Sequence, residues 1–286
     1  MKFFKPDAAV FVPDGLPAED AFCRVTHLGI GAHQDDLEIM AFHGIQKCFT
    51  SRELWFGAVT CTNGGGSPRA GEYSEFTDAD MAALRRREQE KAAILGNYGA
   101  LVQLNYSSAE VKDAGAGRLK ADLVKVLKTA RPEVVYTHNP ADKHDTHVAV
   151  GFAALAALRE LEPAERPATV YGCEVWRGLD WMDDADKVPL DVGRREGLSM
   201  GLIGVYDSQV EGGKRYDLAT AGRRRANAVY FQSHATDEAE QLWFAMDLTP
   251  LVRDDKLDVA AYVLGHVDRF RKSVEDKLRK YWVKAR

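Results

Sequence analysis

Two clusters of imidazoles and carboxylates, far apart in the chain, hold the side chains whose types and spacing suit chemistry. The first cluster contains His33, Asp35 and Asp36. The second contains His144 and His147, and its other polar members are His138, Asp142 and Asp145. Imidazoles and carboxylates are the side chains that most often transfer protons in catalysis. The two clusters therefore predict an active site.

Each cluster also has a purely structural interpretation. Asp35 would serve as a helix N-cap, with Asp36 as a first-turn acid that favours the helix dipole. The catalytic interpretation is favoured because both clusters have the same setting. The first lies between an apolar run at 23–30 and a predicted helix at 36–48, and the second lies between an apolar run at 134–136 and a predicted helix at 146–161. The carboxyl ends of parallel strands in one sheet open into a common crevice. We expect both clusters to face it.

The elements that must position these clusters alternate between strand and helix. Strands are predicted at 23–30, 54–60, 101–104, 132–136 and 168–171, and helices at 36–48, 77–96, 119–130 and 146–161. This rhythm predicts an α/β fold with a Rossmann-like, mostly parallel sheet and helices on both faces. Residues 1–21 are expected to form an N-terminal arm and 22–210 the domain. Residues 211–286 are expected to form a helical extension packed on that domain, ending in a helix from Asp258 to about Trp282.

Composition narrows the class of protein. The chain has 286 residues, 45% of them hydrophobic, and a formal net charge of -5. Phosphate binding requires a basic surface, so no nucleic-acid partner is expected. No signal peptide and no membrane-spanning stretch is predicted, which favours a cytoplasmic location. Four separated cysteines without a Cys-x-x-Cys pair are expected to be reduced and structural.

The segment Ala32–Glu38, followed by Asp142–His147, resembles the paired motifs of the zinc-dependent deacetylases of the PIG-L/LmbE family. The resemblance continues through Arg85–Glu88 and Tyr206–Gln209, and it spans residues 25 to 210. It implies an LmbE-like fold. It also implies hydrolysis of the amide bond in an N-acetylated amino sugar or its conjugate.

The resemblance also implies a role for each residue of the two clusters. His33, Asp36 and His147 would bind one Zn²⁺ ion, with Fe²⁺ or another divalent ion as alternatives. Asp35 would be the general base, and protonated His144 would stabilise the oxyanion. Either Asp35 or His144 would protonate the leaving amine.

Four further residues are expected to bind substrate. Arg85 belongs to the Arg and Glu pair of the motif, and Tyr206 precedes its Ser-Gln pair. Trp176 lies in a loop rich in aromatic and acidic residues, a composition that suits a sugar but also an ordinary surface loop. Asp142 is the fourth candidate, although Asp142 or Asp145 would equally hold a ligand histidine or cap a helix.

Three departures from the family pattern leave the metal ligands intact, and the third of them bears on the substrate. Gln34 replaces a common proline, and Thr146 replaces an aspartate. Ser107 and Ser108 occupy the place of an aspartate that binds sugar hydroxyls. The exact sugar is therefore not predicted.

Alternative hypotheses remain open. The acyl group or the amine could differ from acetyl and amino sugar, or the chain could be a non-catalytic sugar-binding member of the fold. Gly29-x-Gly31 could begin a dinucleotide-binding loop, but the third glycine is missing. A small-molecule sugar and further copies of the same chain are the expected partners, and residues 211–286 are expected to shape an oligomer interface or one wall of the substrate cleft.

Overall fold

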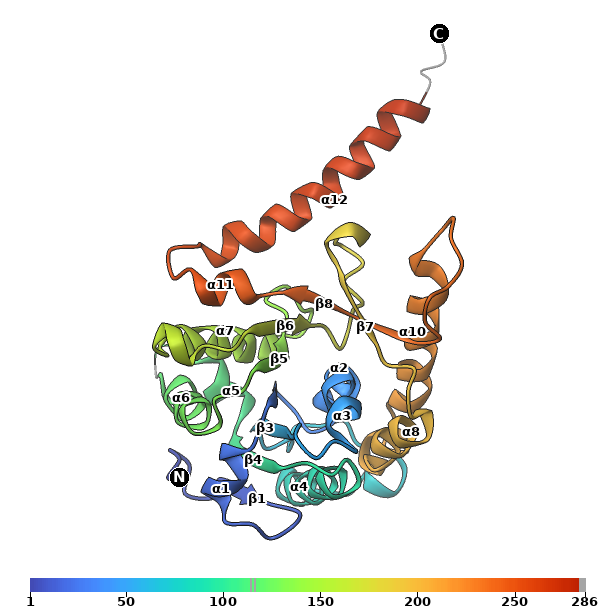
Figure 1. Ribbon diagram of the computed structural model, residues 1–286. Coiled ribbons are helices and arrows are strands. Elements are labelled where there is room, and N and C mark those ends of the chain that lie inside the picture. The colour runs from blue at the N-terminus through green and yellow to red at the C-terminus, as the bar shows by residue number, and fades with distance from the viewer. Residues whose placement is uncertain (114, 116, 283–286) are drawn as a thin grey trace.

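An eight-stranded mixed sheet runs through the computed structural model (Figure 1), which describes residues 1–113, 115 and 117–282. The strands are β1 (Ala9–Phe11), β2 (His27–Gly31), β3 (Phe56–Thr62), β4 (Ala100–Tyr106), β5 (Val134–His138), β6 (Thr169–Cys173), β7 (Val188–Asp191) and β8 (Leu242–Asp247). The α-helices are α1 (Ala18–Cys23), α2 (Asp36–Met40), α3 (Phe42–Cys48), α4 (Asp78–Leu95), α5 (Ser108–Lys112), α6 (Arg118–Ala130), α7 (Asp145–Arg159), α8 (Glu196–Gly204), α9 (Asp207–Val210), α10 (Tyr216–Phe231), α11 (Thr249–Arg253) and α12 (Val259–Tyr281).

The strand order explains why the two polar clusters meet. The order is β1-β4-β3-β2-β5-β6-β8-β7, and β4, β3, β2, β5 and β6 are all parallel to one another. The chain winds outward from β2 through β3 and β4, then returns to place β5 on the other side of β2. The crevice between β2 and β5 is thus a topological switch point, where α/β folds bind ligands. The predicted α/β fold is confirmed.

Helices cover both faces of the sheet and divide the core in two. The helices α1, α5, α6, α7 and α11 pack on one face, and α2, α3, α4 and α8 pack on the other. Gly29 and Gly31 lie within β2, under Leu37 of α2. A Cβ atom at Gly29 would approach Leu37 to 2.9 Å, and one at Gly31 to 3.1 Å. These glycines therefore allow α2 to lie close to the sheet, and they do not form a phosphate-binding loop.

Three parts of the fold differ from the sequence prediction. The helix expected over 36–48 is broken at Ala41 into α2 and α3. The N-terminal arm contains edge strand β1, antiparallel to β4, and its last residue, Ala21, is fully buried. The C-terminal region is more than a helical extension, because its strand β8 lies between β6 and β7 and is antiparallel to both.

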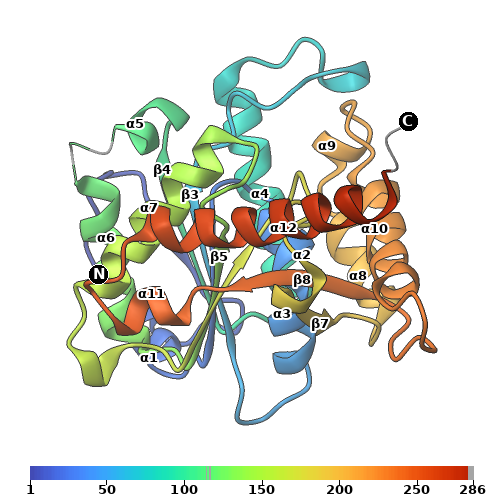
Figure 2. The ribbon, with the colours of Figure 1, turned by 90° about the horizontal axis from the view of Figure 1, so that it is seen from above.

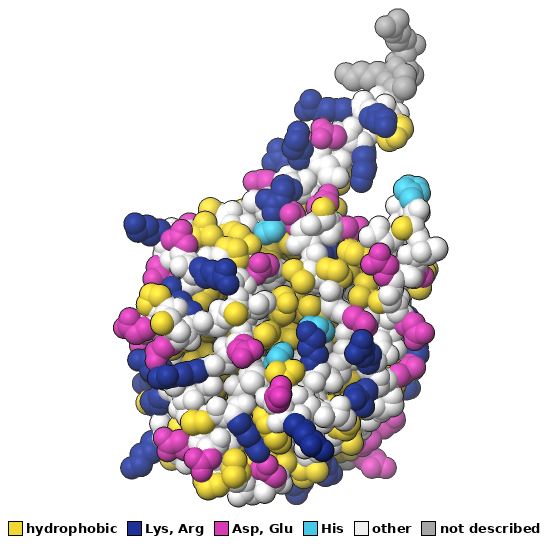
Figure 3. Space-filling view, viewed as in Figure 1, with side chains coloured by type: hydrophobic (Ala, Val, Ile, Leu, Met, Phe, Trp, Pro, Cys, Tyr) yellow, Lys and Arg dark blue, Asp and Glu magenta, His cyan; other side chains and the backbone are white. Residues whose placement is uncertain are grey.

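The last helix, α12, begins on the body of the molecule and then leaves it. Figure 2 shows α12 above β8, and Figure 3 shows its C-terminal half projecting from the body. Its buried residues are Val263 and His266, both in its first half. Among the described residues, no helix is long and apolar enough to cross a membrane.

Candidate active site

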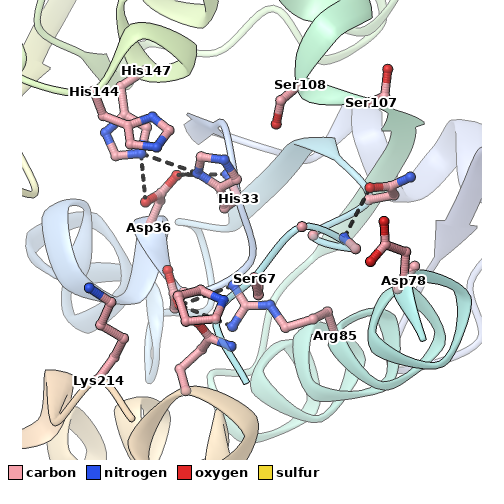
Figure 4. A pocket seen from close by; sticks show the side chains of 18 of the residues that line it. His33, Asp36, Ser67, Asp78, Arg85, Ser107, Ser108, His144, His147 and Lys214 are labelled. Carbon is pink, nitrogen blue, oxygen red and sulfur yellow. Dashed lines mark hydrogen bonds and ion pairs between the residues drawn. The ribbon is translucent and has the colours of Figure 1, made fainter. Parts of the chain in front are cut away.

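Three predicted ligand residues converge at the switch point. His33 follows β2, Asp36 is the first residue of α2, and His147 lies in the first turn of α7. His33 Nδ1 lies 3.2 Å from His147 Nε2 and 3.4 Å from Asp36 Oδ2, and His147 Nε2 lies 3.4 Å from Asp36 Oδ1. In Figure 4 these side chains point toward one another.

These separations suit a metal ion. Zinc binds nitrogen and oxygen at 2.0–2.2 Å in a tetrahedron, which places neighbouring ligand atoms about 3.3 Å apart. Burial alone would raise the pKa of Asp36, but the neighbouring imidazoles of His147 and His138 hold it well below its usual value. The carboxylate is therefore ionised and ready to bind a cation. The described residues thus offer atoms that could hold a divalent metal ion. Sets of three whose ligand atoms lie within 4.8 Å of one another are His33, His144 and His147, and Asp36, His138 and His147.

A fourth imidazole, His138, lies beside this group but is committed elsewhere. Its Nε2 atom accepts a hydrogen bond of 2.8 Å from the backbone N–H of Ala32. The same atom lies 3.3 Å from Asp36 Oδ2. Burial lowers the pKa of His138 to about 4, so the ring is neutral and Nε2 has a single lone pair. Because Ala32 occupies that lone pair, His138 is held in the structure by the backbone, although its position would also let it join Asp36 and His147 at a metal ion.

Asp142 holds the His147 ring from behind. Its carboxylate accepts a hydrogen bond of 3.2 Å from His147 Nδ1, and it also accepts from the backbone N–H groups of His144 and Val175. A carboxylate behind a ligand histidine fixes the ring so that the other nitrogen faces the metal. Asp145, the other candidate for this place, is an exposed first-turn residue of α7.

We expect Asp142→Asn to weaken metal binding by about 10- to 100-fold, the usual effect of losing such a partner. The amide leaves His147 without a charged acceptor and frees its orientation. Titration of the metal-free protein with Zn²⁺ in competition with a chelator measures the change. Asp145→Asn is the matched control and should bind as tightly as wild type. Equal affinity of the two variants would contradict the role given to Asp142.

Asp35 lies beside the three predicted ligands and forms an ion pair with Arg85. Both terminal nitrogens of Arg85, on α4, lie 3.1 Å from Asp35 Oδ2, and one also donates to the carbonyl of Gln34 at 2.5 Å. Asp35 has a φ of 83°, in the left-handed region that non-glycine residues rarely adopt. Burial, partly offset by Arg85, raises the pKa of Asp35 to about 7. A carboxylate with such a pKa suits proton transfer near neutral pH.

His144 stands on the other side of the metal group. Its ring centre is 4.7 Å from that of His147 and 5.2 Å from that of His33. Within the described part of the chain its Nδ1 atom is buried and has no hydrogen-bond partner. Burial and the nearby imidazole of His147 lower the pKa of His144, which disfavours the protonated ring that the resemblance implied. The unpaired ring nitrogen is available to a ligand.

A cavity of about 730 Å³ opens over this group. His33, Asp35, Asp36, His144 and His147 line its floor. The walls come from the glycine-rich loop, α4, α5, the loop after β6 and the C-terminal region, with residues Asn63–Pro68, Asp78, Arg85, Ser107, Ser108, Trp176, Gln209, Lys214 and Tyr216. The volume is in the range of ordinary small-molecule sites.

The other predicted substrate residues fall into two groups. Arg85 and Trp176 line the cavity, and Trp176 stacks near His144 with 6.3 Å between ring centres. Asp142 and Tyr206 are buried and do not line it, and the Tyr206 ring lies behind the Arg85 guanidinium, 5.8 Å away. Their positions support the residues that face the cavity.

Two wall residues, Lys214 and Tyr216, were missed by sequence reasoning. Both lie just before or at the start of α10, and Tyr216 meets the Trp176 ring edge-on at 6.1 Å. The available signal was an aromatic and a basic residue soon after the Ser-Gln pair. Their position supports the expectation that residues 211–286 shape one wall of the cleft.

The Ser-Gln pair reaches the cavity because α4 holds it. Glu88 accepts hydrogen bonds from the backbone N–H of Ser208 at 2.8 Å and from its hydroxyl at 2.6 Å. Gln209, the next residue, lines the cavity. Arg85 and Glu88 are one turn apart, so a single helix fixes both Asp35 and this segment.

Comparison with known proteins agrees with this geometry. Residues 28–158 match the model of the PIG-L family, described as GlcNAc-PI de-N-acetylase. A search of curated proteins found no significant sequence match. Three solved structures share the fold. The N,N'-diacetylchitobiose deacetylase from Pyrococcus horikoshii is 18% identical with a TM-score of 0.57, over 80% of this chain and 87% of that one.

The second structure is GalB, the 4-carboxy-2-hydroxymuconate hydratase from Pseudomonas putida KT2440. It is 20% identical with a TM-score of 0.60, over 77% of this chain and 95% of that one. The third is the zinc-inhibited form of teicoplanin deacetylase Orf2, 15% identical with a TM-score of 0.54, over 78% of this chain and 98% of that one. At these identities the structures establish the fold alone. The match to the family model shows that residues 28–158 carry a PIG-L family domain, as the two motifs predicted.

Proposed function

We propose that the protein is a zinc-dependent hydrolase that removes an acetyl group from an N-acetylated amino sugar or its glycoside. The observation that carries the proposal is the convergence of His33, Asp36 and His147 on the floor of a cavity. Their nearest nitrogen and oxygen atoms are 3.2–3.4 Å apart, and the Asp35 carboxylate lies beside them. The match to the PIG-L family supports it. The named deacetylases among the structures with the same fold are consistent with it.

The residues of the site divide the work of amide hydrolysis. His33, Asp36 and His147 would hold a divalent ion, which would act as a Lewis acid and would lower the pKa of a water molecule toward about 7. Asp35 accepts a proton from the attacking water, and Arg85 keeps the carboxylate in place. Asp35 then returns the proton to the leaving amine. His144, on the opposite side, stabilises the negative charge that develops on the carbonyl oxygen.

The cavity walls suit a sugar. Trp176 and Tyr216 offer aromatic surface, and Ser107, Ser108 and Gln209 offer hydrogen bonds to hydroxyl groups. Hydrogen-bonding groups around an apolar face are the usual means of orienting a small polar ligand. We propose that the sugar ring lies between these walls, with its acetamido group toward Asp35.

Acetate release by the zinc-loaded protein tests this function. The substrates are free, glycosidic and oligomeric forms of N-acetylglucosamine and N-acetylgalactosamine, and Asp35→Asn provides the blank. Release from one substrate, absent from the blank, supports the proposal. Release of a longer acyl acid instead would reassign the acyl group. Failure with every amide would contradict the proposed reaction. The fold itself would still allow another reaction, because GalB has the same fold and is a hydratase.

We also propose that the chain assembles with further copies of itself through α12. The apolar stripe that is covered at Val263 continues along the projecting half, where Phe270 and Val274 are more than a third exposed and Leu278 is 61% exposed. Residues 268–280 contain six basic and three acidic residues, whereas the whole chain carries a net charge of -5. The helix is thus complementary to the acidic remainder of a second copy.

We expect Leu278→Glu to shift the protein toward the monomer, because it places a charge on the most exposed apolar residue of this stripe. Light scattering coupled to size-exclusion chromatography measures the mass across a range of concentrations. Lys272→Glu, on the opposite face of the same helix, is the control for charge alone. A wild-type protein that stays monomeric at high concentration would rule out this assembly.

A further inference from the structure

Arg224, on α10, is a charged side chain in an unusual place. It is 1% exposed, and it forms no ion pair with the carboxylates of residues 1–113, 115 and 117–282. Burial lowers its pKa to about 9. Burying a charge without a counter-ion is costly unless its hydrogen bonds are satisfied in another way. The groups that satisfy Arg224 therefore indicate its role.

Those groups belong to the short helix that carries a metal ligand. One terminal nitrogen of Arg224 donates to the carbonyl oxygens of Glu38 and Ile39, both at 2.9 Å. The other donates to the hydroxyl of Ser199 on α8. The Phe42 ring lies 4.7 Å from the guanidinium carbon and adds a cation–π contact.

The helix α2 needs such a partner. It has five residues and is broken from α3 at Ala41, so its last carbonyls lack the partners that a continuing helix would give. These carbonyls also form the negative end of the helix dipole, where a cation is favourable. A helix of this length is not stable by itself. Arg224 supplies both the missing donors and the positive charge.

The first residue of α2 is Asp36. Its carboxylate accepts a 2.6 Å hydrogen bond from the backbone N–H of His33 and faces His147. The helix is also held from α4 and from the turn after it, since the Glu38 carboxylate accepts hydrogen bonds from Gln89 of α4 and from Tyr98 of that turn. These contacts hold a side chain of α2, whereas Arg224 binds its backbone. A shift of α2 along its axis would move Asp36 relative to both histidines.

We infer that Arg224 is a positioning residue that fixes α2, and through α2 the carboxylate of Asp36, in the metal site. The inference rests on the proposed metal-dependent function. It gives the C-terminal region, outside the part matched by the family model, a direct effect on metal binding.

The test compares Arg224→Met with Arg225→Met. Arg225 is the next residue on α10, but it lies at the surface and pairs with Glu196. We expect Arg224→Met to weaken Zn²⁺ binding at least about 10-fold, as measured by competition with a chelator, and to alter the absorption spectrum of the Co²⁺-substituted site. Hydrogen exchange of the amides of residues 36–41 in the metal-free protein should accelerate. Arg225→Met should change none of these quantities.

Arg224→Lys keeps the inference testable if the methionine variant does not fold. The lysine ammonium group preserves the charge, but it lacks the planar guanidinium that reaches two carbonyls and Ser199. The metal affinity of Arg224→Lys should therefore lie between that of the wild type and that of Arg224→Met. Wild-type affinity, Co²⁺ spectrum and amide exchange in the folded Arg224 variants would overturn the inference. If the wild type binds metal but releases no acetate, the proposed reaction fails, and the metal affinities still decide the role of Arg224. If the wild type binds no metal, exchange at 36–41 decides it.

Discussion

Asp35→Asn should stop acetate release and leave the metal bound. The amide has the size of the carboxylate and still offers an oxygen to Arg85, but it cannot accept a proton from water. The loss of a general base typically lowers the rate by about 10²- to 10⁴-fold. Turnover with the best substrate of the panel, together with metal content after dialysis, measures the two quantities separately.

This variant also leaves the buried Arg85 guanidinium without its counter-ion. Breaking a buried ion pair costs about 3–5 kcal/mol, so folding must be checked by thermal denaturation at the assay temperature. Asp145→Asn, an exposed carboxylate near the same cluster, is the control and should retain wild-type turnover. Full activity of a folded Asp35→Asn protein would transfer the role of base to another group, and His144 would be the next to test.

The candidate site follows from the sequence to the extent that local order determines it. The residues after β2 and β5 carry the ligands, and parallel strands expose their carboxyl ends on one edge. Alternation of apolar runs with amphipathic segments was enough to predict β2 to β6 and the helices α4, α6 and α7, but not α5 or the break between α2 and α3. The bounds of α4 were predicted closely, because Thr77 caps the helix. Its side chain accepts a hydrogen bond from the backbone N–H of Asp80, and the Asp80 side chain accepts one from the backbone N–H of Thr77.

The parts that were not predicted depend on partners distant in the sequence. The strand β7 is four residues long and contains Pro189, a pattern that argues against a strand unless it lies at an edge, where β7 is. No glycine or proline marks the break at Ala41. The break is compatible with the fold because Arg224, far along the chain, binds the freed carbonyls. The spacing of apolar residues along the sequence does not predict such a contact.

The orientation of Arg85 also depends on a partner that is distant in the sequence. In the sequence it is one of three consecutive arginines, and a charge run predicts a solvated helix face. In the structure Arg85 is 1% exposed, whereas Arg86 reaches the carbonyl of Asp7 at the surface. Only the position of Asp35, with its unusual backbone conformation, decides which arginine turns inward. The residue types of a cluster can thus be recognised from the local sequence, but the distant residues that orient them cannot.

Asp36→Ala is expected to abolish metal binding rather than to slow catalysis. It removes one of three ligands, so the loss should exceed the roughly 100-fold effect of an outer partner. The same change removes the acceptor of the His33 backbone N–H and the carboxylate that faces His147. In wild type, saturating metal at about 1,000 times its dissociation constant should stabilise the fold by about 4 kcal/mol. That increment should vanish in the variant.

Thermal denaturation with and without Zn²⁺ separates this effect from simple damage to the fold. Damage lowers the melting temperature under both conditions, whereas loss of the site removes the difference between them. Asp35→Asn is the matched control, because it alters the neighbouring carboxylate and should keep the metal-dependent increase. Stoichiometric zinc in Asp36→Ala would exclude Asp36 from the ligand set. The metal would then have to be held by the three histidines 33, 144 and 147, which also lie within 4.8 Å of one another, and His144 could no longer be free to stabilise the carbonyl oxygen.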